Sequence, residues 1–125
     1  CSILMVFYFT SIHEGAVIYM GKDKYENEKL IKFAFPHDIW FHVDEMSSAH
    51  VYLRMNKPIA SYSEIPAEVV EECVQLTKAN SIEGCKKVGV VVMYTWARNL
   101  LKTQDMAVGA VSFHNPKDIK HVNTQ

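Results

Sequence analysis

Apolar and polar residues alternate on both sides of a short loop in the middle of the chain. Residues 38–43 read Asp-Ile-Trp-Phe-His-Val, and residues 50–54 read His-Val-Tyr-Leu-Arg. Alternation with a period of two on either side of a serine-containing loop predicts an antiparallel hairpin. Only one register keeps both apolar sets on the same, buried face. That register pairs Ile39 with Leu53, Phe41 with Val51, Trp40 with Tyr52, His42 with His50, and Asp38 with Arg54.

The second face of this hairpin would carry Trp40, His42, His50 and Tyr52. Two hypotheses fit these residues. A flat array of aromatic rings and imidazoles suits stacking and hydrogen bonding to a planar, anionic ligand. The same residues could instead form a half-buried ladder, a scaffold that stabilises the hairpin through cross-strand pairs. The pattern alone favours the ladder, and both hypotheses stay open.

The remaining pattern predicts further strands and two helices. Strands are expected over residues 5–10, 16–20, 88–96, 110–114 and 119–122, and helices over 23–34 and from Pro66 to about Ser81. Pro36 forbids continuation of the first helix, and Gly84 is expected to cap the second. This order predicts one α+β domain, in which a mainly antiparallel sheet carries both principal helices on one face.

Composition restricts the kinds of partner. The chain has 125 residues, is 49% hydrophobic and has a net charge of −1 with six histidines, so it fits one domain without a global basic field. Any anionic partner must therefore be bound by a local patch of positive charge.

Three cysteines without a CxxC pair fit neither a disulfide framework nor a zinc site, and favour a reducing compartment. Residues 1–9 are too short to span a bilayer and lack a basic leader.

The segment Lys22–Glu26 follows a glycine and opens the first helix. Backbone N–H groups at a helix start favour an anion, and two lysines add positive charge. Tyr25 could stack on a base or pack inward. Further phosphate-contact candidates lie elsewhere, and Trp96 joins Trp40 and Tyr52 as a stacking candidate. The complete set of predicted nucleic-acid-binding residues is Lys22, Asp23, Lys24, Tyr25, Glu26, Arg54, Arg98 and Lys102.

Two other classes of function remain as alternatives. His42, Asp44 and His50 could form a metal or acid–base site, but a third metal ligand is not evident and no catalytic motif accompanies them. We therefore expect no catalytic residues, no metal and no cofactor. A protein-interaction module is the second alternative, because acidic residues share one helix face and could dock a ribosomal or membrane-associated partner. These residues are Glu64, Glu68, Glu71 and Glu72.

Three blocks of the chain resemble the NFACT-R domain, an RNA-binding module of ribosome quality-control proteins. They are residues 21–30 (GKDKYENEKL), residues 38–51 (DIWFHV…SSAHV), and Val92-Met93-Tyr94-Thr95 followed by Lys102 and Gly109. The resemblance implies binding to RNA, tRNA or the ribosome, and also to DNA through Lys22–Glu26. Lys22 stands where an arginine is common in the family, which weakens a bidentate phosphate contact.

The resemblance also sets expectations about the whole chain. Residues 5–122 are expected to form the NFACT-R-like domain, with residues 1–4 as an upstream extension or an expression remnant. A charged coiled coil follows this domain in related proteins, so the chain is interpreted as the globular head, and the coiled coil as a route to homo-oligomers. The expected location is cytoplasmic or nuclear, with membrane association of the full-length protein implied by resemblance and no transmembrane segment in this chain.

Overall fold

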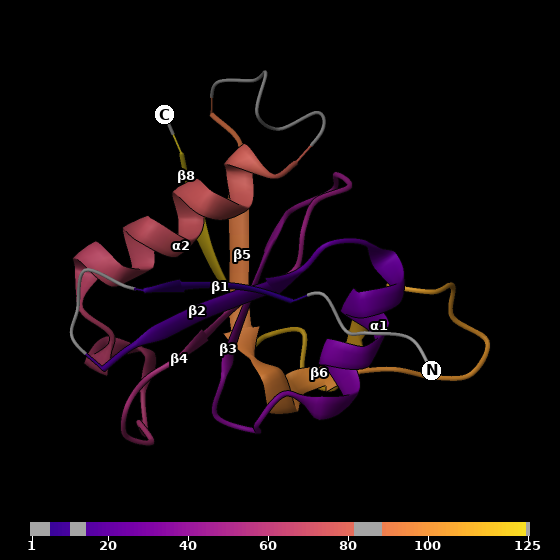
Figure 1. Ribbon diagram of the computed structural model, residues 1–125, viewed down its shortest axis with the longest axis horizontal. Coiled ribbons are helices and arrows are strands. Elements are labelled where there is room, and N and C mark those ends of the chain that lie inside the picture. The colour runs from indigo at the N-terminus through magenta and orange to yellow at the C-terminus, as the bar shows by residue number, and fades with distance from the viewer. Residues whose placement is uncertain (1–5, 11–14, 82–88, 125) are drawn as a thin grey trace.

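A six-stranded antiparallel sheet organises the chain (Figure 1). The computed structural model describes residues 6–10, 15–81 and 89–124. The strand order is β1-β2-β4-β3-β5-β8, and every neighbouring pair is antiparallel. The strands are β1 (Val6–Thr10), β2 (Val17–Gly21), β3 (Ile39–Val43), β4 (Val51–Arg54), β5 (Val91–Trp96) and β8 (Lys120–Asn123). The helices are α1 (Lys24–Phe33) and α2 (Ala67–Ala79), with 3-10 turns η1 (Tyr62–Glu64) and η3 (Ala97–Asn99).

The predicted hairpin of β3 and β4 is confirmed together with its register. Ile39 pairs with Leu53, Trp40 with Tyr52 and Phe41 with Val51. Asp38 and Arg54 form an ion pair of 2.8 Å, and the rings of His42 and His50 lie 5.0 Å apart. The apolar members of the hairpin have no exposed surface. The hydrophobic alternation therefore fixed the pairing as expected.

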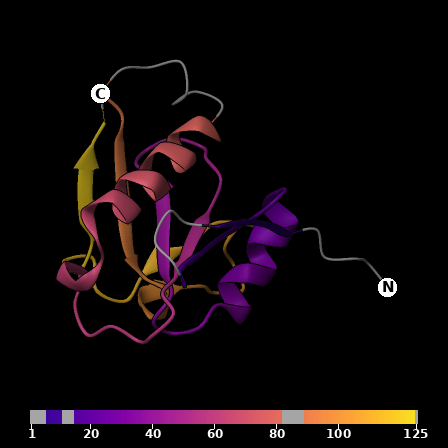
Figure 2. The ribbon, with the colours of Figure 1, turned by 60° about the vertical axis from the view of Figure 1, so that its left-hand side comes forward.

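The two helices cover opposite faces of the sheet, so the expectation that both lie on one face is wrong. On the face of Phe41 and Leu53, α2 packs with Val69 and Cys73. Figure 2 shows α2 lying along the sheet, apart from α1. On the other face, Leu30 of α1 packs with the cluster of Tyr19, Trp40, Tyr52 and Leu100. Each of these clusters forms one half of the core.

The handedness of the connections explains this arrangement. β2–α1–β3 and β4–α2–β5 each join parallel strands across one intervening strand, and both step in the same direction across the sheet. Such crossovers are right-handed almost without exception. Because β2 and β4 run antiparallel, two right-handed crossovers in the same direction must pass on opposite faces. The sequence pattern did not reveal that these connections are crossovers.

The other elements agree with the prediction in part. The first helix ends before Pro36 and α2 begins directly after Pro66, as expected. The strand expected over residues 110–114 is only β7 (Ser112–Phe113), which pairs with the unexpected β6 (Leu100–Leu101) in a separate small sheet. The predicted cap at Gly84 lies outside the described residues. No described helix is both long and apolar enough to cross a membrane.

Candidate nucleic-acid interface

Two adjacent cavities lie at the start of α1. The first has a volume of about 410 Å3 and is lined by residues that include Met20, Lys22, Lys24, Asn27, Ser47 and Asn80. The second, of about 280 Å3, shares Lys24, Asn27, Ser47 and Ser48 with the first and adds His42, His50 and Gly109. Their walls therefore come from α1, from the loop between β3 and β4, from the end of α2 and from the segment before β7.

The carboxylates of the Lys22–Glu26 segment cap the helix. Asp23 Oδ1 accepts hydrogen bonds from the backbone N–H groups of Tyr25 (3.1 Å) and Glu26 (3.0 Å). Glu26 Oε1 accepts one from the N–H of Lys22 (2.9 Å). These three N–H groups are therefore already bonded and are not available to an anion, in contrast to the sequence-based hypothesis. Asp23 and Glu26 act in the structure as capping residues.

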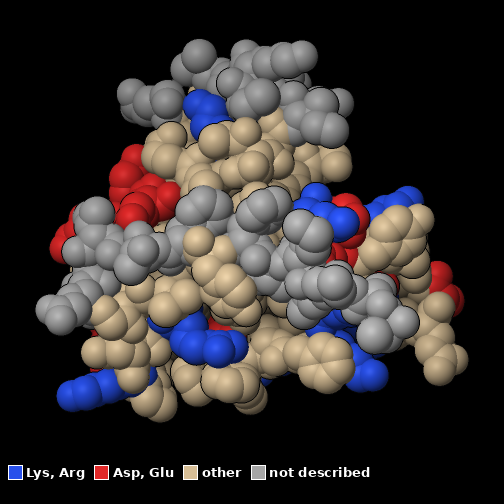
Figure 3. All heavy atoms as spheres, in the orientation of Figure 1, with Lys and Arg blue, Asp and Glu red and all other residues tan. Residues whose placement is uncertain are grey.

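Positive charge at this site comes from lysine side chains. Lys22 and Lys24 are exposed, and Lys and Arg atoms lie over the start of α1 beside acidic ones (Figure 3). Tyr25 is 62% exposed, and the ammonium of Lys24 lies 5.5 Å from the centre of its ring. The inward packing considered for Tyr25 is therefore not found. The start of α1 presents two cations that line the cavities and, beside them, an accessible aromatic ring.

Lys102 lies close to this site but is engaged within the fold. Its ammonium forms a 2.9 Å ion pair with Glu28 of α1 and donates to the carbonyl oxygens of Ala107 (2.6 Å) and Ala110 (2.8 Å). The backbone N–H of Gly109 also donates to Glu28, at 3.3 Å. These contacts hold residues 102–110 against α1. Lys102 therefore holds in place the segment that lines the second cavity, and its expected phosphate contact stays a prediction.

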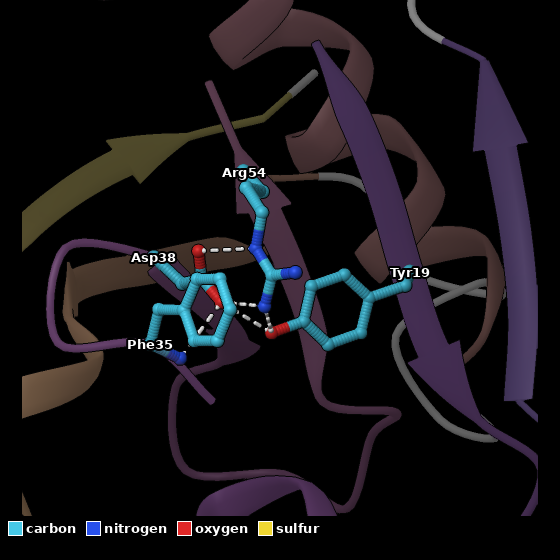
Figure 4. Close-up of polar contacts among 4 residues, drawn as sticks. All are labelled: Tyr19, Phe35, Asp38 and Arg54. Atoms are coloured by element: carbon cyan, nitrogen blue, oxygen red, sulfur yellow. Dashed lines mark hydrogen bonds and ion pairs between the residues drawn. The ribbon is translucent and has the colours of Figure 1, made fainter. Parts of the chain in front are cut away.

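Arg54 lies at the other end of the hairpin and is bound to Asp38 (Figure 4). Its Nε and Nη2 donate to the two oxygens of the Asp38 carboxylate at 2.9 and 2.8 Å. Asp38 is fully buried and also accepts from the Tyr19 hydroxyl (2.5 Å) and the Phe35 N–H (3.0 Å). The guanidinium carbon lies 3.7 Å from the centre of the Phe35 ring. The hydrogen bond from Arg54 to Asp38 raises the pKa of the guanidinium.

Arg98 belongs to the Arg54 end of the molecule. Its backbone N–H donates to the Pro36 carbonyl (3.2 Å), and its guanidinium lies 4.4 Å from the Trp96 ring. Trp96 is 4% exposed and stacks on Tyr62, so it belongs to the core. The structure thus brings Lys22, Lys24 and Tyr25 together and places Arg54 and Arg98 elsewhere.

Three of the four residues on the second hairpin face are buried. Trp40, His50 and Tyr52 are at most 4% exposed, so they cannot stack on a ligand and act as the scaffold. Trp40 Nε1 donates to His50 Nδ1 at 2.9 Å, which leaves the proton of the neutral imidazole on Nε2. Burial, with smaller contributions from His42 and Lys102, lowers the pKa of His50 to about 3. Burial also lowers the pKa of His42, which is only partly exposed.

The structure adds residues that the sequence reasoning did not single out. Asn27 is 7% exposed and lines both cavities, and its Oδ1 has no hydrogen-bond partner among the described residues. A Cβ added at Gly21 would lie 2.9 Å from this Oδ1, so the glycine permits the close approach. Asn27 and Gly109 both belong to the blocks quoted for the family resemblance, and this membership is the sequence signal that could have identified them. The described residues contain no group of three metal ligands.

Comparison with known proteins places these features in a family. Residues 5–115 match the NFACT protein RNA-binding domain family. The chain is 57% identical over 124 residues to coiled-coil domain-containing protein 25 of Bos taurus, covering 97% of this chain and 59% of that protein. A homolog in Dictyostelium discoideum is 51% identical over 118 residues, covering 94% of this chain and 57% of that protein. The chain thus spans less than two thirds of the length of these relatives.

A solved structure supports the fold. The C-terminal part of the fibronectin/fibrinogen-binding protein from Streptococcus suis superimposes with a TM-score of 0.77 at 21% identity, covering 94% of this chain and 43% of that one. This likeness concerns the fold alone. Together, the family match over most of the chain and the high identity to its relatives show that the chain belongs to the NFACT RNA-binding domain family.

Proposed function

We propose that this domain binds the backbone of RNA or DNA through Lys22 and Lys24, with Tyr25 beside them. The observation that carries the proposal is the exposure of these three side chains at the start of α1, where the two lysines also line the first cavity. Lysines neutralise phosphates without reading sequence, and an exposed ring can stack on a base. The capping carboxylates Asp23 and Glu26 support the site indirectly, since they fix the start of α1 from which the lysines project.

The rest of the proposal concerns the longer protein. Binding to a ribosome, a role in ribosome quality control, a cytoplasmic or nuclear location, membrane association and homo-oligomers through a coiled coil remain proposals that follow from the resemblance. We further propose that the domain is not an enzyme. The family is described by RNA binding, and the two histidines at the cavities are held neutral by burial within a structural cluster.

A salt series tests the proposal. Labelled tRNA, single-stranded RNA and duplex DNA are titrated with the domain between low and physiological salt. The proposal predicts an affinity that falls as salt rises. The slope of log affinity against log salt concentration gives the number of phosphate contacts, because each contact contributes roughly 0.7 for single strands and roughly 0.9 for duplex. The ranking of the three ligands identifies the preferred nucleic acid. Absence of binding to all three at low salt would contradict the proposal.

A protein-docking role is the second candidate function. Glu68 and Glu71 are exposed on α2, and acidic side chains gather at one edge of the molecule beside this helix (Figure 3). The Glu64 carboxylate already accepts hydrogen bonds from the backbone N–H groups of Ala60 and Ser61, so it is less available to a partner. A basic protein partner would fit this edge. Binding of such a partner that survives nuclease treatment and is lost in Glu68→Lys with Glu71→Lys would support this role.

A further inference from the structure

We infer that the two cavities behind the start of α1 accept one unstacked nucleobase of a single strand, while Lys22 and Lys24 hold the neighbouring phosphates. This inference rests on the proposed function and names the part of the ligand that enters the site. The cavities have volumes of about 410 and 280 Å3, comparable with small-molecule sites of roughly 300–1,000 Å3. The cations lie at the mouth, and neutral polar groups lie deeper.

The buried polar side chains of the cavities require a ligand that both donates and accepts hydrogen bonds. Asn27 is 93% buried and lines both cavities, and its Oδ1 lacks a partner among the described residues. This oxygen lies against Gly21, so it accepts from a ligand once the amide turns towards the cavity. His50 is 96% buried, lines the second cavity, and presents Nε2–H as a donor because Nδ1 is taken by Trp40. A phosphate oxygen accepts but does not donate at neutral pH, so it matches only one of these groups. The edge of a nucleobase carries donors and acceptors side by side.

The cavity walls suit a planar ring. His42 and Met46 line the second cavity, and an imidazole and a thioether both make favourable contacts with aromatic rings. Gly109 forms the opposite side with a φ of +84°, and a Cβ there would lie 3.1 Å from Lys24 Cβ. The ion pair of Lys102 with Glu28 holds this segment in place. The walls are therefore formed before the ligand arrives.

The experiment compares strands that have the same phosphates but differ in whether their bases are present and unpaired. The probes are a labelled single-stranded RNA, the same strand with abasic positions and an unchanged phosphate count, and the corresponding duplex. The inference predicts that the intact strand binds at least about fivefold tighter than the abasic strand, and tighter than the duplex in which the bases are stacked.

Two variants locate the effect. Ser47→Leu adds an apolar side chain at an exposed residue that lines both cavities, and Gln75→Leu on the exposed face of α2 is its matched control. His50→Asn keeps an acceptor for Trp40 Nε1 and removes the Nε2 donor. Both Ser47→Leu and His50→Asn should reduce the preference for the intact strand without changing affinity for the abasic strand. Gln75→Leu should bind like the unmodified domain.

The outcomes separate the inference from the proposed function. If the intact and abasic strands bind equally, yet Lys22→Glu with Lys24→Glu weakens both, the base site is wrong and backbone binding stands. If neither strand binds at low salt, the proposed function itself fails. A preference for the intact strand that persists in Ser47→Leu and His50→Asn would also overturn the inference, because the base would then be bound elsewhere.

Discussion

At the residue scale, two buried polar side chains, Asp38 and His50, have partners that the fold supplies. Asp38 is fully buried and is bonded by Arg54, the Tyr19 hydroxyl and the Phe35 N–H. His50 is buried and is bonded by Trp40. Such groups destabilise a protein when one partner is removed, because the remaining group stays buried without compensation.

Loss of the Arg54 side chain should destabilise the domain without affecting nucleic-acid binding. Arg54→Met removes two hydrogen bonds to Asp38, one of 3.5 Å to the Tyr19 hydroxyl, and the charge that offsets the buried Asp38. We expect the free energy of unfolding to fall by about 3 kcal/mol, the lower part of the range for breaking a buried pair, because the arginine side chain is 35% exposed. Urea unfolding measures this. Arg54→Lys should lose less, and a loss of affinity as large as that of a Lys22 variant would contradict the structural role.

Stability should fall below neutral pH because of His50. Its pKa is about 3 in the folded domain and about 6.5 in the unfolded chain. Between these values the unfolded chain binds more protons, so stability is complete above pH 6.5 and is lost as the pH falls towards 3. One histidine of this kind contributes a slope of about 1 kcal/mol per pH unit between pH 6 and 5.

Urea unfolding at several pH values between 7.5 and 5 measures this slope. His50→Asn should reduce the slope by about 1 kcal/mol per pH unit, although the variant is less stable at every pH because its shorter side chain leaves a void. His42 contributes in the same direction, since burial lowers its pKa as well. An unchanged slope in His50→Asn would show that the imidazole is not held neutral by burial.

At the element scale, the start of α1 and the segment 102–110 form one unit. Asp23 and Glu26 close the helix start, and Lys102 with Gly109 joins the segment to Glu28 of the same helix. The position of Lys24 is therefore fixed from both sides. A change in the segment should alter binding although the segment carries no exposed cation of its own in the site.

Gly109→Ala should weaken both the fold and the binding of nucleic acid. The residue has a φ of +84°, and an added Cβ would press on Lys24 Cβ at 3.1 Å. We expect a loss of about 1–2 kcal/mol in the free energy of unfolding. Gly89→Ala is the matched control, because Gly89 has a φ of +77° while the nearest atom among the described residues would lie 4.0 Å from the added Cβ. Thermal unfolding and RNA titration of both variants test this prediction. Equal effects of the two variants on affinity would show that the contact between residue 109 and Lys24 does not affect binding.

The elements show which sequence signals determine structure. Strict alternation at Ile39, Phe41, Val51 and Leu53 predicted the register of β3 and β4, since a one-residue slip would move every apolar side chain of one strand to the opposite face of the sheet. Alternation alone could not place the helices, because the choice of face depends on chain direction and crossover handedness. The short β6 and β7 strands pair only two residues each, too few for a periodic signal.

At the scale of the whole molecule, the two ends of the hairpin have different roles. One end holds the buried Asp38 cluster with Arg54 and Arg98 nearby, and the other holds the cavities with Lys22 and Lys24. The sequence identified the helix-start lysines as candidates from local pattern. It could not distinguish them from Arg54 and Lys102, because the partners of those cations lie 16 and 74 positions away along the chain.

The most direct test of the account is RNA binding by a charge-reversal pair and its matched control. Lys22→Glu with Lys24→Glu alters the site, whereas Lys57→Glu with Lys117→Glu alters two exposed lysines outside the cavities and changes the net charge by the same amount. The account predicts that the first pair weakens binding to single-stranded RNA at least about tenfold with unchanged thermal unfolding, while the second pair stays within about threefold of the unmodified domain. Equal weakening by both pairs, or unchanged binding by the first, would contradict the start of α1 as the nucleic-acid site.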